Sequence, residues 1–315
     1  MGRLVLRRLL ALVPVLLIVS FAVFFLLALV PGNPAITLAG GVTATPAQIA
    51  HVTAQLHLND PLLVQYGRWL GNALHGNLGT SISTGQPVTQ QIEQRFPVTF
   101  GLVVASAIVS LVVGIPVGLI SGIRPQGVVD GGARTFTTLG LAVPSFWLAV
   151  LLVSIFAVHW HVFPPTGYTS ISTSFTSWLR DITLPAITLG VLVGATLARQ
   201  LRASLIDTLD TPYIRTAWAK GGTRRTVLFR HGLKNAAMPV VTVFGIQIGY
   251  LLGGAVIIEQ IFALPGLGPY MLSGITDHDL PVVQGVAVVF VLFQMAMSLL
   301  VDISYGYLNP KVRVS

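Results

Sequence analysis

The chain has 315 residues, of which 53% are hydrophobic and only 9% are charged. Soluble globular proteins average about 25% charged residues, so this composition excludes a water-solvated surface as well as disorder, collagen and a coiled coil. The formal net charge is +8. In a soluble protein this charge would suggest binding to nucleic acid, but in so apolar a chain it first suggests the orientation of the protein in a membrane. The sequence contains no cysteine, which excludes disulfides, thiolate metal sites and a cysteine nucleophile.

Six stretches without charged residues predict six transmembrane helices, because a bilayer core needs about 20 apolar residues per helix. They cover approximately 9–30, 98–123, 136–158, 182–198, 239–258 and 282–301. The first could instead be a secretory signal peptide, but its 22-residue apolar run exceeds the roughly 7–15 residues of a signal segment. We therefore expect it to remain as a helix that ends at Pro31, Gly32 and Pro34.

Lysine and arginine predict the orientation in the membrane. The segments that would share one side carry 15 of these residues, and the other side carries 3. The positive side faces the cytoplasm, so we expect both termini there. The resulting organisation is a cytoplasmic end and first span (1–30), an extracytoplasmic helical segment (31–97), a transmembrane core (98–303) with a cytoplasmic loop (199–238), and a cytoplasmic tail (304–315).

The outer segment contains two helix start signals. Thr45-Pro46 predicts a short helix with proline at its first position. Asn59-Asp60-Pro61 opens another, which is followed by apolar residues at amphipathic spacing. A small helical region outside the membrane follows from these signals.

The inner loop 199–238 predicts two short basic helices joined by a glycine turn. Thr211 followed by Pro212 starts the first, and Gly221-Gly222 stops it after Lys220. Thr223 caps the second, which we expect to end near Gly232. Such a loop could bind anionic lipid, bind nucleic acid or dock a partner. Partner docking fits best, because nucleic acid binding is improbable for so short an insertion between spans.

The chemistry that the sequence lacks is informative. It has no GxxxxGK[ST] phosphate loop and only three lysines, so we expect no ATP hydrolysis by this chain. The apolar stretches hold no ionisable residues apart from their ends, whereas ion-coupled pumps place such residues at membrane depth. His159 and His161 bracket Trp160, but without a third clustered ligand we expect interfacial histidines and no metal site.

Neutral polar side chains at membrane depth are candidates for a translocation path. For any one of them a hydrogen bond between helices is the favoured role, but as a set they suit the passage of a polar solute. The candidates for the path are Ser145, Gln247, Tyr250, Gln284 and Gln294.

The inner loop resembles a known family. Its sequences are YIRTAWAKG at 213–221 and RHGLKN at 230–235, followed by Pro239. They are similar to the "EAA" loop of binding-protein-dependent ABC importer permeases, in the form typical of the dipeptide/oligopeptide subfamily. Gly221 matches the signature glycine of that loop, and Arg215 stands where other subfamilies have a glutamate.

The resemblance extends over nearly the whole chain. It includes the outer segment, the Val143-Pro144-Ser145-Phe146 motif, and the closing Leu308-Asn309-Pro310-Lys311. It also covers the last outer loop, which the resemblance implies as a contact for a binding protein. The residues matched there are Glu259, Phe262, Pro265, Gly266, Gly268 and Asp279.

The resemblance implies an all-α polytopic membrane protein with a type I (MetI-like) permease core, an added N-terminal helix and an outer helical segment. Such a chain forms half of a translocation path in the plasma (inner) membrane of a prokaryote. Its implied partners are a sister permease, two cytoplasmic ATPase subunits that bind ATP and Mg, and an extracytoplasmic substrate-binding protein.

The resemblance further implies that a coupling helix, roughly Thr211 to Arg225, docks on one ATPase, and the chain itself would hold no cofactor. The residues assigned to this coupling loop are Tyr213, Arg215, Thr216, Ala217, Lys220, Gly221, Arg224, Arg225, His231 and Asn235.

Two other classes of function are weighed against this one. A self-sufficient secondary transporter or channel is disfavoured by the missing intramembrane charges. A membrane-embedded enzyme is disfavoured by the missing catalytic constellation. Peptides are the expected cargo, although similar permeases serve nickel, glutathione, haem and oligosaccharides. The sequence leaves open whether the second permease is a sister chain or a second copy.

Overall fold

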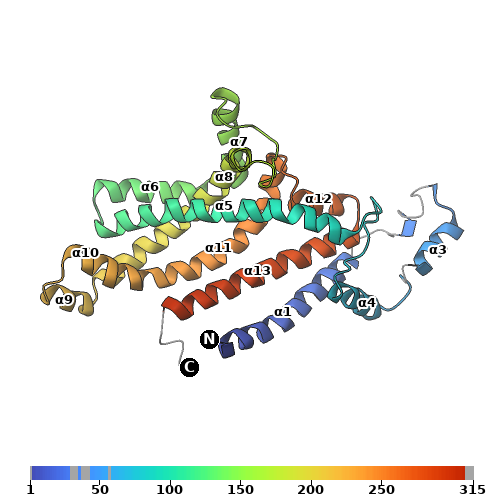
Figure 1. Cartoon of the computed structure of the whole chain (residues 1–315), viewed down its shortest axis with the longest axis horizontal. Helices are drawn as coiled ribbons and strands as arrows, with labels where there is room; N and C mark the ends of the chain where they lie inside the picture. The colour runs from blue at the N-terminus through green and yellow to red at the C-terminus, as the bar shows by residue number, and fades with distance from the viewer. Residues whose placement is uncertain (1, 29–34, 37–42, 56–57, 309–315) are drawn as a thin grey trace. The chain divides into compact units, whose positions relative to one another are not determined.

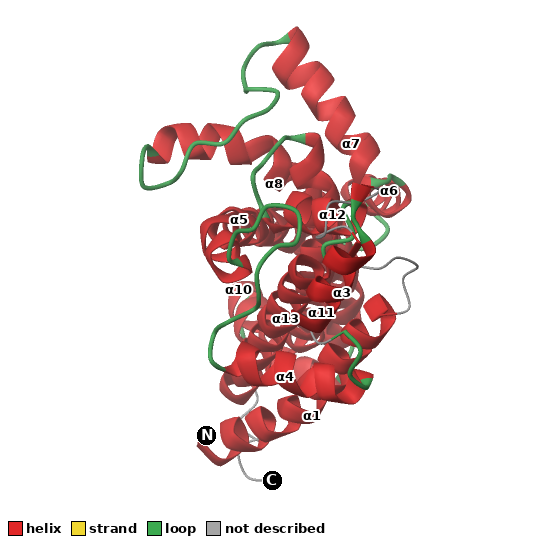
Figure 2. Ribbon diagram, turned by 90° about the vertical axis from the view of Figure 1, so that its right-hand side faces the viewer, coloured by secondary structure: helices red, strands yellow, loops and turns green. Residues whose placement is uncertain are grey.

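A computed structural model describes residues 2–28, 35–36, 43–55 and 58–308. The described part is helical and holds no β-strand (Figure 2). Two sets of residues named in the sequence analysis lie outside the described part of the chain. They are the predicted end of the first helix at Pro31, Gly32 and Pro34, and the closing residues Asn309-Pro310-Lys311. The chain divides into two compact units, one built mainly from Thr99–Leu264 and one from Leu6–Val98 with Pro265–Met295.

The outer segment forms the helices that its capping residues predict. Helix α3 spans Pro46–Gln55, and Thr45 and Gln48 cap its start reciprocally through backbone N–H groups. Helix α4 spans Leu62–Leu74 directly after Pro61. In the same unit, Tyr66 of α4 hydrogen-bonds Ser20 of α1 (Gly2–Ala28) at 2.8 Å and stacks edge-on against Phe24. These contacts anchor α4 on the first helix.

The rest of this unit packs around the start of α5 (Val88–Ile123). Its core joins Val88 and Ile92 of α5 to Leu267 of α12 (Leu267–Thr276) and Val282 of α13 (Leu280–Leu308). Gly285 of α13 lies so close that an added Cβ would meet Val88 Cγ1 at 2.8 Å. The hydrophobic contacts therefore fix α12 and α13 against α5.

In the other unit, α8 (Phe175–Leu209) is the central helix. Of its most apolar stretch 67% is buried, against 28–33% in the other long helices. It packs against α6 (Val128–Ala142), α7 (Ser145–Leu152) and α11 (Lys234–Ile261). Figure 1 shows α6 lying along α5, while α8 crosses α5. A helix buried on so many sides can be apolar without facing lipid.

Glycines at four-residue spacing bring α5 and α8 together. A Cβ at Gly118 would lie 2.7 Å from the Ala198 carbonyl oxygen, and one at Gly114 would lie 2.6 Å from that of Gly194. Gly190 faces the Ser106 carbonyl oxygen of α5 in the same way. Small residues in this pattern let two helix backbones approach closely within a membrane.

The expected count of six continuous spans is not confirmed. Four described helices are long and apolar enough to cross a bilayer: Val88–Ile123, Phe175–Leu209, Arg224–Ile261 and Leu280–Val301. The described apolar part of α1, Val13–Phe25, is shorter than a full span. Among the described residues, a fifth span is present if the bent pair formed by α6 and the segment Ser145–His159 counts as one.

The predicted span 136–158 is bent at Pro144. The chain bends by 106° between α6 and α7, which continues as the π-helix η2 (Val153–His159). Figure 2 shows α7 leading away from α6. Pro144 is the cause, because it lacks an N–H and forces the residue before it out of the helical region. Val143 accordingly has an extended backbone, with φ −82° and ψ 123°.

Candidate functional site: the basic helical loop between α8 and α11

The loop between α8 and α11 begins with a short helix whose ends are set by local sequence. Helix α9 spans Pro212–Ala219, with Thr211 at its N-cap and proline at its first position. The chain reverses at Gly221, whose φ is +80°, a conformation that glycine adopts without strain. Its N–H donates to the Trp218 carbonyl at 2.9 Å, and the Gly222 N–H donates to Ala217 at 3.2 Å.

The second helix of the loop differs from the expectation. Thr223 caps it, accepting a hydrogen bond from the Thr226 N–H at 3.3 Å. The helix does not stop near Gly232: α10 (Arg224–Thr226) runs through the π-helix η3 (Val227–Leu233) into α11. Gly232 is a close-packing position, where an added Cβ would meet Leu209 Cδ2 at 3.1 Å. The coupling helix expected over 211–225 is consequently two helical pieces separated by the Gly221 turn.

A set of side-chain hydrogen bonds ties α9 to the start of α11. The Asn235 amide donates to the Tyr213 hydroxyl at 2.7 Å and to the His231 carbonyl oxygen at 3.0 Å. The Tyr213 hydroxyl in turn donates to the same His231 carbonyl at 3.2 Å. Three residues from the two arms of the loop therefore close a small hydrogen-bonded ring.

The apolar side of α9 is buried beneath this ring. Ile214 is 1% exposed and Val227 of η3 is fully buried, and α9 contacts η3, which itself packs against α8. Burial of these two side chains contributes about 1.5–3 kcal/mol each. The short helix is thus fixed to the ends of α8 and α11.

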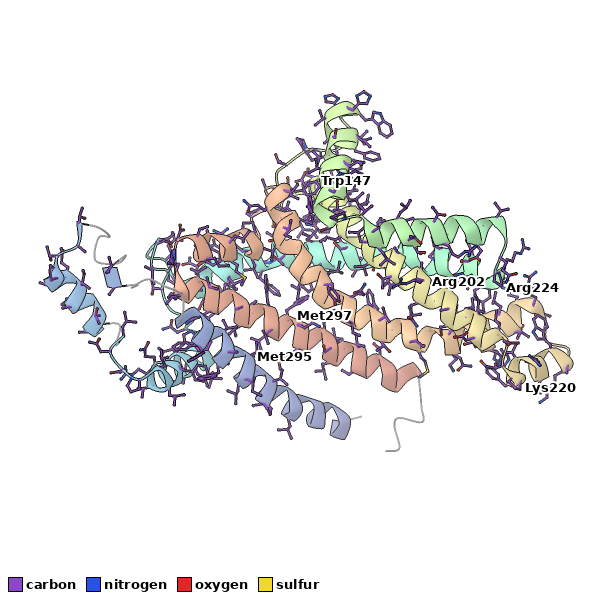
Figure 3. The ribbon with its side chains drawn as sticks, turned by 180° about the vertical axis from the view of Figure 1, so that it is seen from behind. Trp147, Arg202, Lys220, Arg224, Met295 and Met297 are labelled. Atoms are coloured by element: carbon purple, nitrogen blue, oxygen red, sulfur yellow. The ribbon has the colours of Figure 1, made fainter. Side chains whose placement is uncertain are left out.

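The loop also carries exposed cations and aromatic rings on α9, at its end and on α10. Arg215, Lys220, Arg224 and Arg225 are exposed, as are the rings of Tyr213 and Trp218. Figure 3 shows Lys220 and Arg224 at this end of the unit. Asp210 pairs with Arg215 at 2.9 Å and is the one acidic residue in 210–235, against six lysines and arginines. Thr216 Oγ1 donates to the Pro212 carbonyl within α9, at 3.1 Å, and the Ala217 carbonyl accepts the Gly222 N–H at the turn.

The candidate path residues fall in both units. Ser145 begins α7, and Gln247 and Tyr250 lie on α11, where Tyr250 is 70% exposed. Gln284 and Gln294 lie on the part of α13 that belongs to the other unit, and both are at least partly buried. Their role in transport stays a prediction.

The candidate outer residues are also divided between the units. Glu259 and Phe262 are buried at the end of α11, and the Phe262 carbonyl accepts a hydrogen bond from the Gly167 N–H at 3.2 Å. Pro265, Gly266 and Gly268 lead into α12 in the other unit. Contact of this region with a binding protein stays a prediction.

Asp279 organises the outer segment of its own unit. It is fully buried, and its Oδ2 accepts hydrogen bonds from Ser81 Oγ at 2.6 Å and from the N–H and hydroxyl of Ser83 at 3.0 Å each. Tyr270 lies in the same unit with the Arg95 guanidinium 4.8 Å from its ring centre. Burial, and after it the Asp279 carboxylate, raises the pKa of Tyr270, so the phenol is neutral.

One buried ion pair escaped the sequence analysis. Asp130 of α6 is fully buried, and Arg202 of α8 donates two hydrogen bonds to its carboxylate, at 2.6 and 2.9 Å. The Gln126 N–H donates a third, at 2.8 Å. Because the partners lie 72 residues apart, no local pattern indicates the pair. In the described part of the chain, no group of three or more potential metal ligands occurs.

Comparison with known proteins identifies the family. Residues 114–314 match the family described as "Binding-protein-dependent transport system inner membrane component", and residues 1–103 match its N-terminal component. The chain belongs to this family. It is the permease component of an ABC importer and a multi-pass inner-membrane protein.

Similar proteins agree with this assignment. A probable peptide ABC transporter permease of Sinorhizobium fredii is 39% identical over 99% of this chain and 100% of its own length. A glutathione transport system permease protein of Pectobacterium atrosepticum is 41% identical over 98% of this chain and 97% of its own. A solved structure of the MetNI methionine ABC transporter in an inward-facing conformation has a TM-score of 0.57 at 18% identity, covering 70% of this chain and 97% of that one, and shows that the fold is shared.

Proposed function

We propose that this permease carries di- or oligopeptides, or a related small solute such as glutathione, into the cell. Support comes from relatives that are similar over nearly the full length of the chain and whose names specify peptide or glutathione transport. The charge distribution supports an orientation with both termini in the cytoplasm, so that the α9 loop projects inward.

In this proposal the chain supplies half of the path and a sister permease supplies the other half. An extracytoplasmic binding protein delivers the solute. Two cytoplasmic ATPase subunits bind ATP and Mg and supply the energy, since this sequence has no phosphate loop of its own.

The observation that carries the proposal is the rigid attachment of α9 to two long helices. Its apolar side is buried against η3, and the Tyr213–Asn235–His231 ring fixes its orientation. The exposed cations and aromatic rings of the loop are accessible to acidic or carbonyl groups of an ATPase surface. Displacement of α9 by an ATPase is therefore transmitted to α8 and α11 instead of being absorbed within the loop.

The test is affinity purification of the tagged chain from its native membrane in mild detergent, followed by mass spectrometry. We expect a second permease, an ATPase and a substrate-binding protein, whose ligand then defines the cargo. Recovery of the chain alone, still able to transport in ATP-free liposomes, would contradict the proposal and favour a secondary transporter.

A further inference from the structure

A cavity of about 260 Å³ lies beside the buried Asp130–Arg202 pair. It lies in one unit and is formed by residues of α5, α6 and α8. Its polar lining consists of Ser121, Arg134, Thr137, Thr138, Arg199 and Arg202, and the rest of its wall is apolar. Figure 3 shows Arg202 on α8 toward the end of the unit that carries Lys220 and Arg224.

The cavity has an excess of positive charge. Three arginines line it, whereas Asp130 is the one carboxylate that the described ion pairs place beside them. Arg202 donates a hydrogen bond to each oxygen of that carboxylate. Arg134 lies farther away, with its Nε 3.5 Å from Asp130 Oδ2. Arg199 is exposed and makes no ion pair with any described residue. The lining therefore attracts an anion.

The donor types favour a phosphate group. Guanidinium groups bind phosphate oxygens through paired N–H donors, and a hydroxyl such as that of Thr138 adds a further donor. The Thr137 hydroxyl is already committed, since it donates to the Arg134 carbonyl at 2.9 Å. The Ser121 hydroxyl and Arg202 both donate to Asp130. The available donors are thus those of Arg134, Arg199 and Thr138.

The surroundings favour a lipid as the source of that phosphate. Exposed apolar residues share helix sides with cavity residues: Leu141 of α6 is 43% exposed and Ile120 of α5 is 52% exposed. Leu141 lies seven residues, about two turns, beyond the cavity residue Arg134, and Ile120 lies three residues beyond the cavity residue Val117. An apolar helix side next to a basic cavity suits acyl chains beside a headgroup, and basic pockets between membrane helices bind anionic headgroups.

We propose that the cavity between α5, α6 and α8 binds the phosphate group of an anionic phospholipid, with Arg199 as its principal free cation. The cavity is separate from the exposed residues of the α9 loop, and the proposal does not depend on the identity of the transported solute.

The experiment uses the full chain, purified with its co-purifying subunits and washed free of lipid in detergent. Phosphatidylglycerol or phosphatidylcholine is then titrated, and bound lipid is counted by native mass spectrometry. We expect preferential binding of phosphatidylglycerol. Arg199→Gln is expected to weaken that binding roughly fivefold, the usual contribution of one basic side chain near an anionic lipid. Thr138→Val, which removes a hydroxyl at similar volume, is a second variant expected to weaken it.

Arg124→Gln is the matched control, because Arg124 is exposed between α5 and α6 and does not line the cavity. It should bind phosphatidylglycerol like the unaltered chain. Equal loss in the Arg124 and Arg199 variants would overturn the site in favour of a diffuse basic surface, as would equal binding of the two lipids. Inorganic phosphate is the third probe: if it raises the melting temperature as much as phosphatidylglycerol does, the ligand is a soluble phosphate and the lipid assignment is wrong.

Discussion

The Asn235 side-chain amide donates a hydrogen bond of 2.7 Å to the Tyr213 hydroxyl, and so connects the first turn of α9 to the first turn of α11. Both side chains also bond the His231 carbonyl oxygen, within η3. The bond matters because α9 is only eight residues long, and a helix of that length has little stability of its own in water. Its position depends on these contacts and on the burial of Ile214.

The first prediction concerns this hydrogen-bonded ring. Tyr213→Phe removes the hydroxyl that joins both partners, and Asn235→Leu removes the other donor. Each substitution should cost about 1 kcal/mol of loop stability and lower solute uptake per ATP hydrolysed. Because the two side chains share one interaction, the double variant should lose less than the sum of the single losses. Uptake and ATPase activity measured in proteoliposomes test this, and strictly additive losses would show that the ring does not act as a unit.

The second prediction concerns the turn that ends α9. Gly221→Ala meets no steric neighbour within 4 Å, so its cost comes from the φ of +80° alone, about 1–2 kcal/mol for a residue with a Cβ. We expect reduced coupling of transport to ATP hydrolysis at a normal membrane level of the protein, and a larger loss for Gly221→Asp. Gly253→Ala is the matched control, since Gly253 also has open space and lacks a positive φ. Normal coupling in the Gly221 variants would exclude the coupling role.

The third prediction concerns the contact between α5 and α8. Gly118→Ala would place a Cβ 2.7 Å from the Ala198 carbonyl oxygen and 3.0 Å from its Cα, so backbone must move, at a cost of about 1–3 kcal/mol. The melting temperature of the purified protein should fall. Gly132→Ala on α6, which has nothing within 4 Å, should leave it unchanged or raise it slightly. Equal melting temperatures for the two variants would refute close packing at Gly118.

The fourth prediction concerns the outer segment. Asp279→Ala removes the acceptor of three hydrogen bonds from Ser81 and Ser83 and should cost about 2 kcal/mol or more of local stability. Limited proteolysis between residues 76 and 87 should accelerate. The exposed neighbour Asp277 offers the comparison: Asp277→Ala should be cut at the unaltered rate, and identical digestion of both variants would count against this role of Asp279.

Local chemistry explains which features could be predicted from the sequence. The start and stop of α9 were predictable because Thr211, Pro212 and Gly221 act through their own backbones. At Pro144 the sequence permits a kink or break, although the continuous apolar run around it favours an unbroken span and proline is tolerated in membrane helices. The stop expected at Gly232 failed because a glycine can serve packing as well as termination.

Long-range pairings were beyond a local analysis. Asp130 and Arg202 lie 72 residues apart, and nothing near either residue indicates the other. The glycine repeat was visible in principle, since Gly114, Gly118 and Gly122 recur every four residues. The small residues Gly190, Gly194 and Ala198 of α8, which contact this repeat, also recur every four residues. The spacing alone does not show which two helices meet.

The most direct test of the central claim is site-specific crosslinking from α9. The sequence has no cysteine, so Ala219→Cys, at an exposed position of α9, creates the single thiol of the chain. A bismaleimide applied to native membranes, followed by mass spectrometry of the adduct, should identify an ATP-binding subunit. Leu74→Cys, at a 77% exposed position of α4, should give no such adduct. An ATPase adduct from position 74, or none from position 219 despite full labelling of its thiol, would contradict docking of the ATPase on α9.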